Sequence, residues 1–268
     1  MMITLTSEQL NKVKQYELSI MRSIHKICVD NKITYTLFCG TLLGAIRHNG
    51  FIPWDDDIDI LMSEDDYHLF KKACIKCMPK NLFLQDDESE KGSCLTNIAK
   101  VRMENTCLLE QPNVGKNMHN GVWVDIFIYK TFNGDQKILN KGNKLLNNYK
   151  RRRDALPLKN KSFKGKIWSI LFVLTHPHST DFYRNKYNKF YRSLNCNGDY
   201  LLMPDCNIKL AQLKTEYLKD MSLKQFEKDK FYVIKNYDLA LTFHYGDYMK
   251  LPEEKDRISI HQYIRVEL

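Results

Sequence analysis

The chain has 268 residues, of which 43% are hydrophobic and 12% aromatic. This length and composition allow one generous core, which excludes a disordered protein and predicts one main domain with a helical elaboration. The net charge of +9 comes from one segment, since residues 150–192 hold twelve Lys or Arg and only two acids. A nucleic-acid-binding protein more often carries its positive charge around its site or along a recognition element, so we expect no nucleic-acid partner.

The first 50 residues predict a helix, a strand and a second helix. An amphipathic helix is expected over residues 6–30, because Thr6 and Gln9 fit a capping box and apolar residues recur at spacings of three, four and seven. The β-branched and aromatic residues 33–39 predict a strand. Residues 41–50 predict a short helix directly after it.

Acidic and apolar residues alternate in the next segment. The DIDI sequence at 57–60 has the period of a half-buried strand, so the carboxylates of Asp57 and Asp59 are expected to project from the same face. Ser63 is a suitable N-cap for a helix over residues 64–78.

Four more strands are expected before residue 130. Three of them are short and lie at 81–85, 97–103 and 106–110. The fourth, at 121–129, is strongly apolar and contains one acid, Asp125.

Beyond residue 129 the composition shifts toward Lys, Asn and Arg, and helix is expected through about residue 195. An apolar run, IWSILFVLT at 167–175, lies within this stretch. The last third of the chain predicts a helix that stops at Gly246.

The run of Asp55, Asp56, Asp57 and Asp59 packs four acids into five residues. Carboxylates this close repel one another, which raises their pKa values unless a divalent cation neutralises them. Ligands that are all oxygen suit Mg²⁺ or Mn²⁺. The alternative is a solvated acidic loop, against which the apolar neighbours, including Trp54, argue.

Asp125 lies between Val124 and Ile126, where a lone buried carboxylate would be costly. A metal site shared with the acid pair would supply a partner, and two metals could clamp the attacking and leaving oxygens of a displacement at phosphorus. Asp125 could then ligate a metal and take the proton from an attacking hydroxyl. Alternatively, Asp125 caps a bulge or pairs with Arg102.

Five other residues are candidates for phosphate binding. Gly40 and Thr41 lie where the strand turns into a helix, and the backbone N–H groups at a helix N-terminus suit a phosphate. Arg47 lies between this turn and the acid pair. Lys100 and Arg102 share a face of a predicted strand and could offset a diphosphate charge, although ordinary surface cations remain an alternative.

The segment YTLFCGTLLGAIRHNGFIPWDDDIDILMSEDDY closely resembles the LicD family, the bacterial phosphocholine transferases related to the fukutin-related proteins, within the nucleotidyltransferase superfamily. The resemblance continues at GVWVDIF and at YGDYMKLPEEKDR. It implies an α+β fold, with a nucleotidyltransferase-like mixed β-sheet flanked by helices, a helical basic insert and C-terminal helices. The implied division is a catalytic core at 1–130, the insert at 131–199 and a helical region at 200–268 that completes the catalytic domain.

The resemblance also assigns roles to residues of the first motifs. The superfamily's glycine motif corresponds to Gly40 and Thr41. Its paired metal carboxylates fall on Asp57 and Asp59, and its third carboxylate falls on Asp125. The implied cofactor is Mg²⁺ or Mn²⁺.

The family's usual donor is CDP-choline, and its product is a phosphodiester on a sugar hydroxyl with CMP as the leaving group. The expected acceptor is a lipid-linked glycan such as a teichoic acid, lipopolysaccharide or capsule precursor. Three alternatives stay open: transfer of glycerol or ribitol phosphate from a CDP donor, nucleotidyl transfer from a nucleoside triphosphate, and a non-catalytic binding module.

Choline carries a quaternary ammonium, which usually rests on aromatic faces. The candidates are Trp54, Trp123, Tyr245 and Tyr248, with ordinary packing roles as the alternative. Asp247 belongs to the C-terminal motif and is expected to shape the site.

No N-terminal signal and no apolar run of about 20 residues is present, so we expect a cytoplasmic protein. The basic excess at 150–192, beside the apolar run at 167–175, predicts peripheral contact with an anionic membrane at the inner face of the plasma membrane. A buried helix with a solvated basic face is the alternative.

Overall fold

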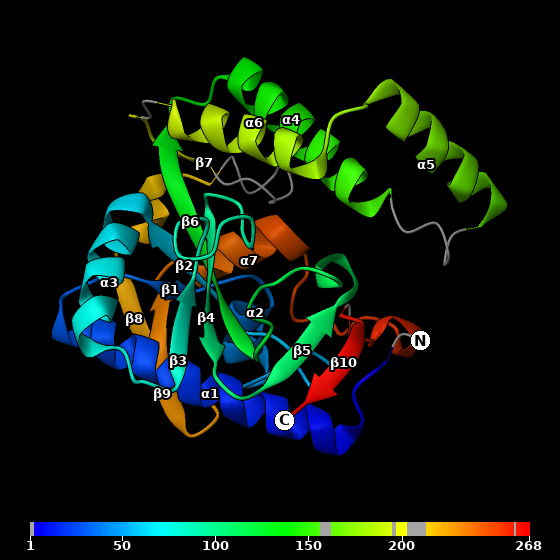
Figure 1. Cartoon of the computed structure of the whole chain (residues 1–268). Helices are drawn as coiled ribbons and strands as arrows, with labels where there is room; N and C mark the ends of the chain where they lie inside the picture. The colour runs from blue at the N-terminus through cyan, green and yellow to red at the C-terminus, as the bar shows by residue number, and fades with distance from the viewer. Residues whose placement is uncertain (1–2, 156–161, 195–196, 203–212, 260) are drawn as a thin grey trace.

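The computed structural model describes residues 3–155, 162–194, 197–202, 213–259 and 261–268. It has the expected α+β fold, in which a mixed sheet is flanked by helices (Figure 1). The helices and strands are, in chain order, α1 Ser7–Asp30, β1 Thr36–Leu37, α2 Cys39–Arg47, β2 Asp59–Ser63, α3 Glu64–Cys77, β3 Leu82–Gln85, β4 Ile98–Met103, β5 Cys107–Glu110, β6 Trp123–Phe132, α4 Gln136–Asp154, α5 Phe163–Thr175, α6 Thr180–Arg192, β7 Tyr200–Leu202, β8 Met221–Phe226, β9 Asp229–Ile234, α7 Tyr237–Tyr245 and β10 Tyr263–Glu267.

The central sheet has the strand order β1-β2-β6-β4-β3, and β7 pairs with the far end of β6. Strands β2 and β6 run parallel, whereas β6 and β4 run antiparallel. Ile60, Ile126 and Ala99 face one another across these three strands and are fully buried. Because side chains alternate between the faces of a sheet, the residues directly before Ile60 and Ile126 project from the opposite face.

Two predicted helix N-termini are confirmed. The Thr6 hydroxyl oxygen accepts from the Gln9 backbone N–H at 3.2 Å, and the Gln9 side chain accepts in return from the Thr6 N–H at 3.0 Å. Ser63 caps α3 by accepting from the Asp66 N–H at 3.0 Å. These caps satisfy backbone donors that the first helical turn leaves without intrahelical partners.

The strand predicted at 33–39 is reduced to β1, because α2 begins earlier than expected. Phe38 takes the N-cap position of α2, and Cys39 opens the helix with a φ of +44°. A non-glycine residue in this left-handed region is strained, and such strain is often stored at functional sites.

The C-terminal region is less helical than predicted. Its described residues contain one α-helix, α7, and four strands, of which β8 and β9 form a hairpin. The reason is the two-residue period of the segments 221–226 and 229–234, which join through a tight turn where Glu227 has a φ of +57°. The helix α7 does stop at Gly246, as predicted.

The predicted insert is helical and consists of α4, α5 and α6. Helices α4 and α6 lie side by side near the end of β6, and α5 projects outward from them (Figure 1). A small separate core joins this layer to the sheet through Phe132, Leu146, Tyr187 and Tyr191. Among the described residues, every helix is too short or too polar to cross a membrane.

Candidate functional site

Two carboxylates and an ammonium group lie in register on three neighbouring strands of the sheet. Asp59 on β2 is the register partner of Asp125 on parallel β6, and Asp125 is in turn the partner of Lys100 on β4. Asp59 and Asp125 are each only 9% exposed. Residues in register on neighbouring strands share a face, so the pairing of three strands converges these three side chains.

Asp57 lies just before β2 rather than within it, because the strand begins at Asp59. It is nevertheless close to both other acids. Burial, then repulsion from Asp55 and other acids including Asp125, raises the pKa of Asp57 to about 8. Burial and the charges of Asp57 and Asp125 likewise raise the pKa of Asp59. Asp59 and Asp125 are thus paired in register, and the charge of Asp57 acts on both, while the Asp57 carboxylate itself lies among those of Asp55 and Asp56.

The loop before β2 adds further acids next to these carboxylates. The carboxylates of Asp55, Asp56 and Asp57 have oxygen atoms that all lie within 4.8 Å of one another. Such crowding is unfavourable for ionised acids unless a cation lies among them. An all-oxygen donor set, in which the pKa values of Asp55 and Asp57 are raised, fits Mg²⁺ or Mn²⁺, hard cations that bind carboxylates.

Gly40 and Thr41, at the start of α2, support the acids. A Cβ atom at Gly40 would lie 2.7 Å from Asp55 Oδ2, so any larger residue would displace this carboxylate. The Thr41 hydroxyl oxygen accepts the backbone N–H of Asp59 at 2.8 Å. Glycine thus permits close approach of the loop, and Thr41 fixes the start of the acidic strand.

Both oxygens of Asp125 have a hydrogen-bond donor. Lys100 Nζ lies 2.5 Å from Oδ1, and the Trp123 indole N–H donates to Oδ2 at 2.7 Å. Lys100 also lies over the Trp123 ring, 4.5 Å from its centroid. The expected alternative partner, Arg102, instead bonds the Gly121 carbonyl at 2.7 Å and the Gln85 side chain. Arg102 is buried and ties strands together, although it also borders the cavity beside Asp125.

Trp123, a candidate for choline binding, is only 2% exposed. Trp54 is more accessible, and the Arg257 guanidinium lies 5.7 Å from its ring centroid. Tyr245 is 40% exposed. Burial and then the charges of Cys39 and the acid cluster raise its pKa, and Tyr245 lines a pocket together with Cys39 and Leu42 of α2.

The contacts of Arg47 and Asp247 give less support for a ligand-binding role than those of the residues above. The Arg47 guanidinium donates to the Tyr248 carbonyl at 2.8 Å and so fixes the turn after α7. Asp247 is exposed within that turn.

Two C-terminal residues that the sequence did not reveal contact the acid cluster. His261 Nδ1 lies 2.9 Å from Asp56 Oδ1, and the Tyr263 hydroxyl donates to Asp56 Oδ2 at 2.9 Å. Burial alone would raise the pKa of Asp56, but these hydrogen bonds hold this pKa below its usual value. The pKa of His261 is raised to about 9 by its bond to Asp56 and the charge of Asp57, despite burial. These contacts favour the imidazolium form of His261.

Glu17 of α1 is a further acid beside the cluster. It is 1% exposed, and its Oε2 atom has no hydrogen-bond partner among the described residues. Burial, followed by the charges of Asp57, Asp56 and Asp55, raises its pKa well above 4.5. A sequence signal existed, because Glu17 occupies the buried stripe of α1 between Val13 and Ile20.

A cavity of about 300 Å³ opens beside Asp125. Its cationic lining comes from three parts of the chain: β4, the loop after β5, and the insert helix α4. The cations are Lys100, Arg102, Lys116, Lys150 and Arg153. A cavity with this lining suits an anionic ligand such as a phosphorylated one.

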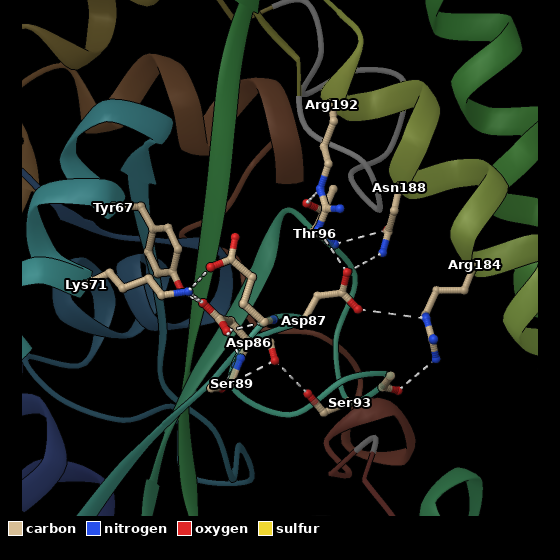
Figure 2. A network of polar contacts seen from close by, with 12 residues as sticks. Tyr67, Lys71, Asp86, Asp87, Ser89, Ser93, Thr96, Arg184, Asn188 and Arg192 are labelled. Carbon is tan, nitrogen blue, oxygen red and sulfur yellow. Dashed lines mark hydrogen bonds and ion pairs between the residues drawn. The ribbon is translucent and has the colours of Figure 1, made fainter. Parts of the chain in front are cut away.

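A polar network fixes the loop that forms another wall of this cavity (Figure 2). Asp87 accepts from Asn188 Nδ2 and from Arg192 Nη2, each at 3.0 Å, and the Thr96 backbone N–H donates to the Asn188 side chain at 3.1 Å. Lys71 of α3 bridges the neighbouring acids of the same loop. The network thus joins the core helix α3, the loop after β3 and the insert helix α6.

Comparison with known proteins gives one family and three relatives. The family described as LicD/FKTN/FKRP, nucleotidyltransferase domain, matches residues 32–170. The lipopolysaccharide cholinephosphotransferase LicD of Haemophilus influenzae is 31% identical over 257 residues, which cover 91% of this chain and 92% of that protein. Uncharacterized protein RP689 of Rickettsia prowazekii is 44% identical over 77 residues, 25% of this chain and 28% of that protein. A similar short match, 42% over 76 residues, is found with uncharacterized protein RT0683 of Rickettsia typhi.

Proposed function

This chain belongs to the LicD family and is a transferase, and on that premise we propose that it moves phosphocholine from CDP-choline to a hydroxyl of a cell-surface glycan. The relative from Haemophilus influenzae carries cholinephosphotransferase in its name and aligns over nearly its whole length. The observation in the structure that carries the proposal is the convergence of Asp57, Asp59 and Asp125 beside a cationic cavity.

The carboxylates of Asp57, Asp59 and Asp125 would hold Mg²⁺ or Mn²⁺, which neutralises the donor diphosphate and favours displacement at phosphorus. Lys100 faces both Asp125 and the cavity, so its ammonium group is placed to contact a phosphate oxygen. Lys116 lines the same cavity and adds positive charge, and Arg153 also lines it but is paired with Asp154. This arrangement favours a donor with two phosphates.

In the proposed step the acceptor hydroxyl oxygen attacks the phosphorus that bears choline. The bond between that phosphorus and the oxygen of CMP breaks in line with the attack, and CMP leaves as an anion. The hydroxyl proton passes to Asp125. Each Asp125 oxygen already accepts one hydrogen bond, but a carboxylate oxygen has two lone pairs and can accept another.

For the choline group, Trp54 and Tyr245 are the accessible aromatic residues near the acids. A cation already lies over the Trp54 ring, namely the Arg257 guanidinium. A ring face that accepts one cation suits a quaternary ammonium as well. The acceptor in this proposal is a lipid-linked glycan precursor, and the reaction takes place on the cytoplasmic side of the membrane.

The test is to incubate the protein with Mg²⁺, a glycan acceptor extract and CDP-choline, CDP-glycerol or CDP-ribitol, and to follow CMP release. We expect CMP from CDP-choline first, and loss of this activity in Asp57→Asn but not in the exposed Asp65→Asn control on α3. Preference for CDP-glycerol or CDP-ribitol would mean that the transferred group is glycerol phosphate or ribitol phosphate rather than phosphocholine. Pyrophosphate release from a nucleoside triphosphate, without CMP release, would refute phosphocholine transfer.

A further inference from the structure

Helix α5 exposes an unusually apolar surface. Trp168 is 72% exposed, Leu174 71% and Phe163 79%. Ile167, Ile170 and Leu171 are exposed as well. At 100° per residue these six side chains fall within an arc of about 160° on the helix, which also includes Lys164 in the first turn and Thr175 at the last position. Its opposite side, with the buried Ser169, faces the rest of the protein.

Among the residues that the structure describes on α5 and the last turn of α4, the charges are either positive or already paired. Lys164 and Lys166 of α5 are exposed, and the helix contains no acid. The last turn of the neighbouring α4 adds Arg151 and Arg152, while its acid Asp154 pairs with Arg153. The occupant of this surface should therefore combine apolar and anionic character.

From these observations we infer that α5 docks on an anionic membrane, lying in the interface with its apolar face among the lipid chains and its lysines among the head groups. Thirteen residues of helix extend about 20 Å, which is less than the roughly 30 Å of a bilayer core, so α5 lies along the surface rather than across it. Tryptophan prefers this interfacial depth. A symmetric pairing of two copies through α5 would instead bring the lysines and arginines of both copies together.

The position of α5 connects this surface to the active site. A groove of about 670 Å³ between α4 and α5 is lined by Lys150, Trp168 and Phe172, among others. Lys150 also lines the cavity that contains Asp125. A membrane held at α5 would therefore lie beside the insert helix α4, which borders the cavity next to Asp125. The docking itself does not require phosphocholine to be the transferred group.

The experiment is flotation of the whole protein with vesicles of phosphatidylcholine alone or with 30% phosphatidylglycerol. We expect the protein to float with the anionic vesicles and less so at high salt. The double variant Trp168→Ser/Leu174→Ser should weaken the partition into anionic vesicles by at least ten-fold. Full burial of even one such apolar side chain changes a partition constant by a factor of roughly ten or more. The matched control Leu69→Ser/Ile75→Ser removes exposed apolar side chains from α3 and should float like the unchanged protein.

Two further readouts separate the lipid from other occupants. Lys164→Glu/Lys166→Glu should lower binding to anionic vesicles by more than twenty-fold, at about five-fold per cation, and leave the weak binding to phosphatidylcholine unchanged. The fluorescence of Trp168 should shift to shorter wavelength on vesicle binding, and Trp168→Phe should abolish the shift. Equal flotation of all variants would overturn the inference. So would a dimer in sedimentation equilibrium that Trp168→Ser/Leu174→Ser dissociates, with no vesicle binding.

Discussion

Replacing Glu17 by Gln should stabilise the protein at neutral and alkaline pH in the absence of divalent cations. Glu17 is buried beside three aspartates, and burial and their charges raise its pKa. The folded state therefore keeps the Glu17 proton at a pH where the unfolded chain has released it. Stability falls with pH wherever the folded state binds more protons than the unfolded state. Glutamine has the shape of protonated glutamate and removes this penalty.

The size of the effect follows from the proton balance. Each pH unit between the ordinary value of 4.5 and the raised folded pKa costs about 1.4 kcal/mol of unfolding free energy. At pH 7.5 the penalty is thus at most about 4 kcal/mol, and at pH 4.5 it is close to zero. The difference between Glu17→Gln and the unchanged protein should grow across this window and then level off above the folded pKa.

Urea unfolding with EDTA at half-unit steps from pH 5 to pH 8 measures this difference. The control is Glu8→Gln, on the exposed first turn of the same helix, which should stay within about 0.5 kcal/mol of the unchanged protein. Mg²⁺ should narrow the difference for Glu17→Gln, because a cation in the cluster makes ionisation of Glu17 easier. A difference for Glu17→Gln that is constant with pH would refute the reasoning.

Three other outcomes are expected. Mg²⁺ binding at pH 7 should release protons, since the pKa of Asp57 is raised to about 8. Calorimetry in buffers of different ionisation enthalpy measures the number of protons released, and zero release would contradict the placement of the cation. Trp123→Phe should lower the kcat for CMP release by roughly ten-fold or more without unfolding, because Asp125 loses a charge-assisted hydrogen bond of about 1.5–3 kcal/mol. Asn188→Ala should cost about 1–3 kcal/mol in urea unfolding, because Asp87 and the Thr96 N–H lose a partner, whereas the exposed Asn185→Ala should cost little.

Much of the fold followed from local patterns in the sequence. Capping residues and apolar spacing located α1 and α3. Two-residue alternation predicted that Asp57 and Asp59 project from one face of a strand, but the strand begins only at Asp59 and leaves Asp57 in the preceding loop. Alternation within one segment cannot say which strand lies beside it. The register of Asp59 opposite Asp125 comes from parallel pairing of strands more than sixty residues apart, and only the motifs of the family suggested it.

His261 and Tyr263, the site residues that the sequence did not predict, show the same limit of local sequence patterns. Asp56 meets His261 and Tyr263 from the far end of the chain, and no spacing rule connects them. Lys100 and Arg102 were correctly placed on one face, yet the structure separates their surroundings. Lys100 reaches Asp125, whereas Arg102 satisfies a buried carbonyl and an amide. Such differences depend on which polar groups lack partners after the strands assemble.

The charge balance of the site explains why a phosphorylated donor suits it. Two protein cations are each committed to an acid, Lys100 to Asp125 and His261 to Asp56. Asp57 and Asp59 keep raised pKa values despite these cations, so the cluster carries more carboxylates than the protein itself neutralises. A divalent cation would remove this excess and leave positive charge facing the cavity, where the cations of β4 and α4 gather. With such a cation bound, the charge of a diphosphate would match both sides of the site, as the proposed donor requires.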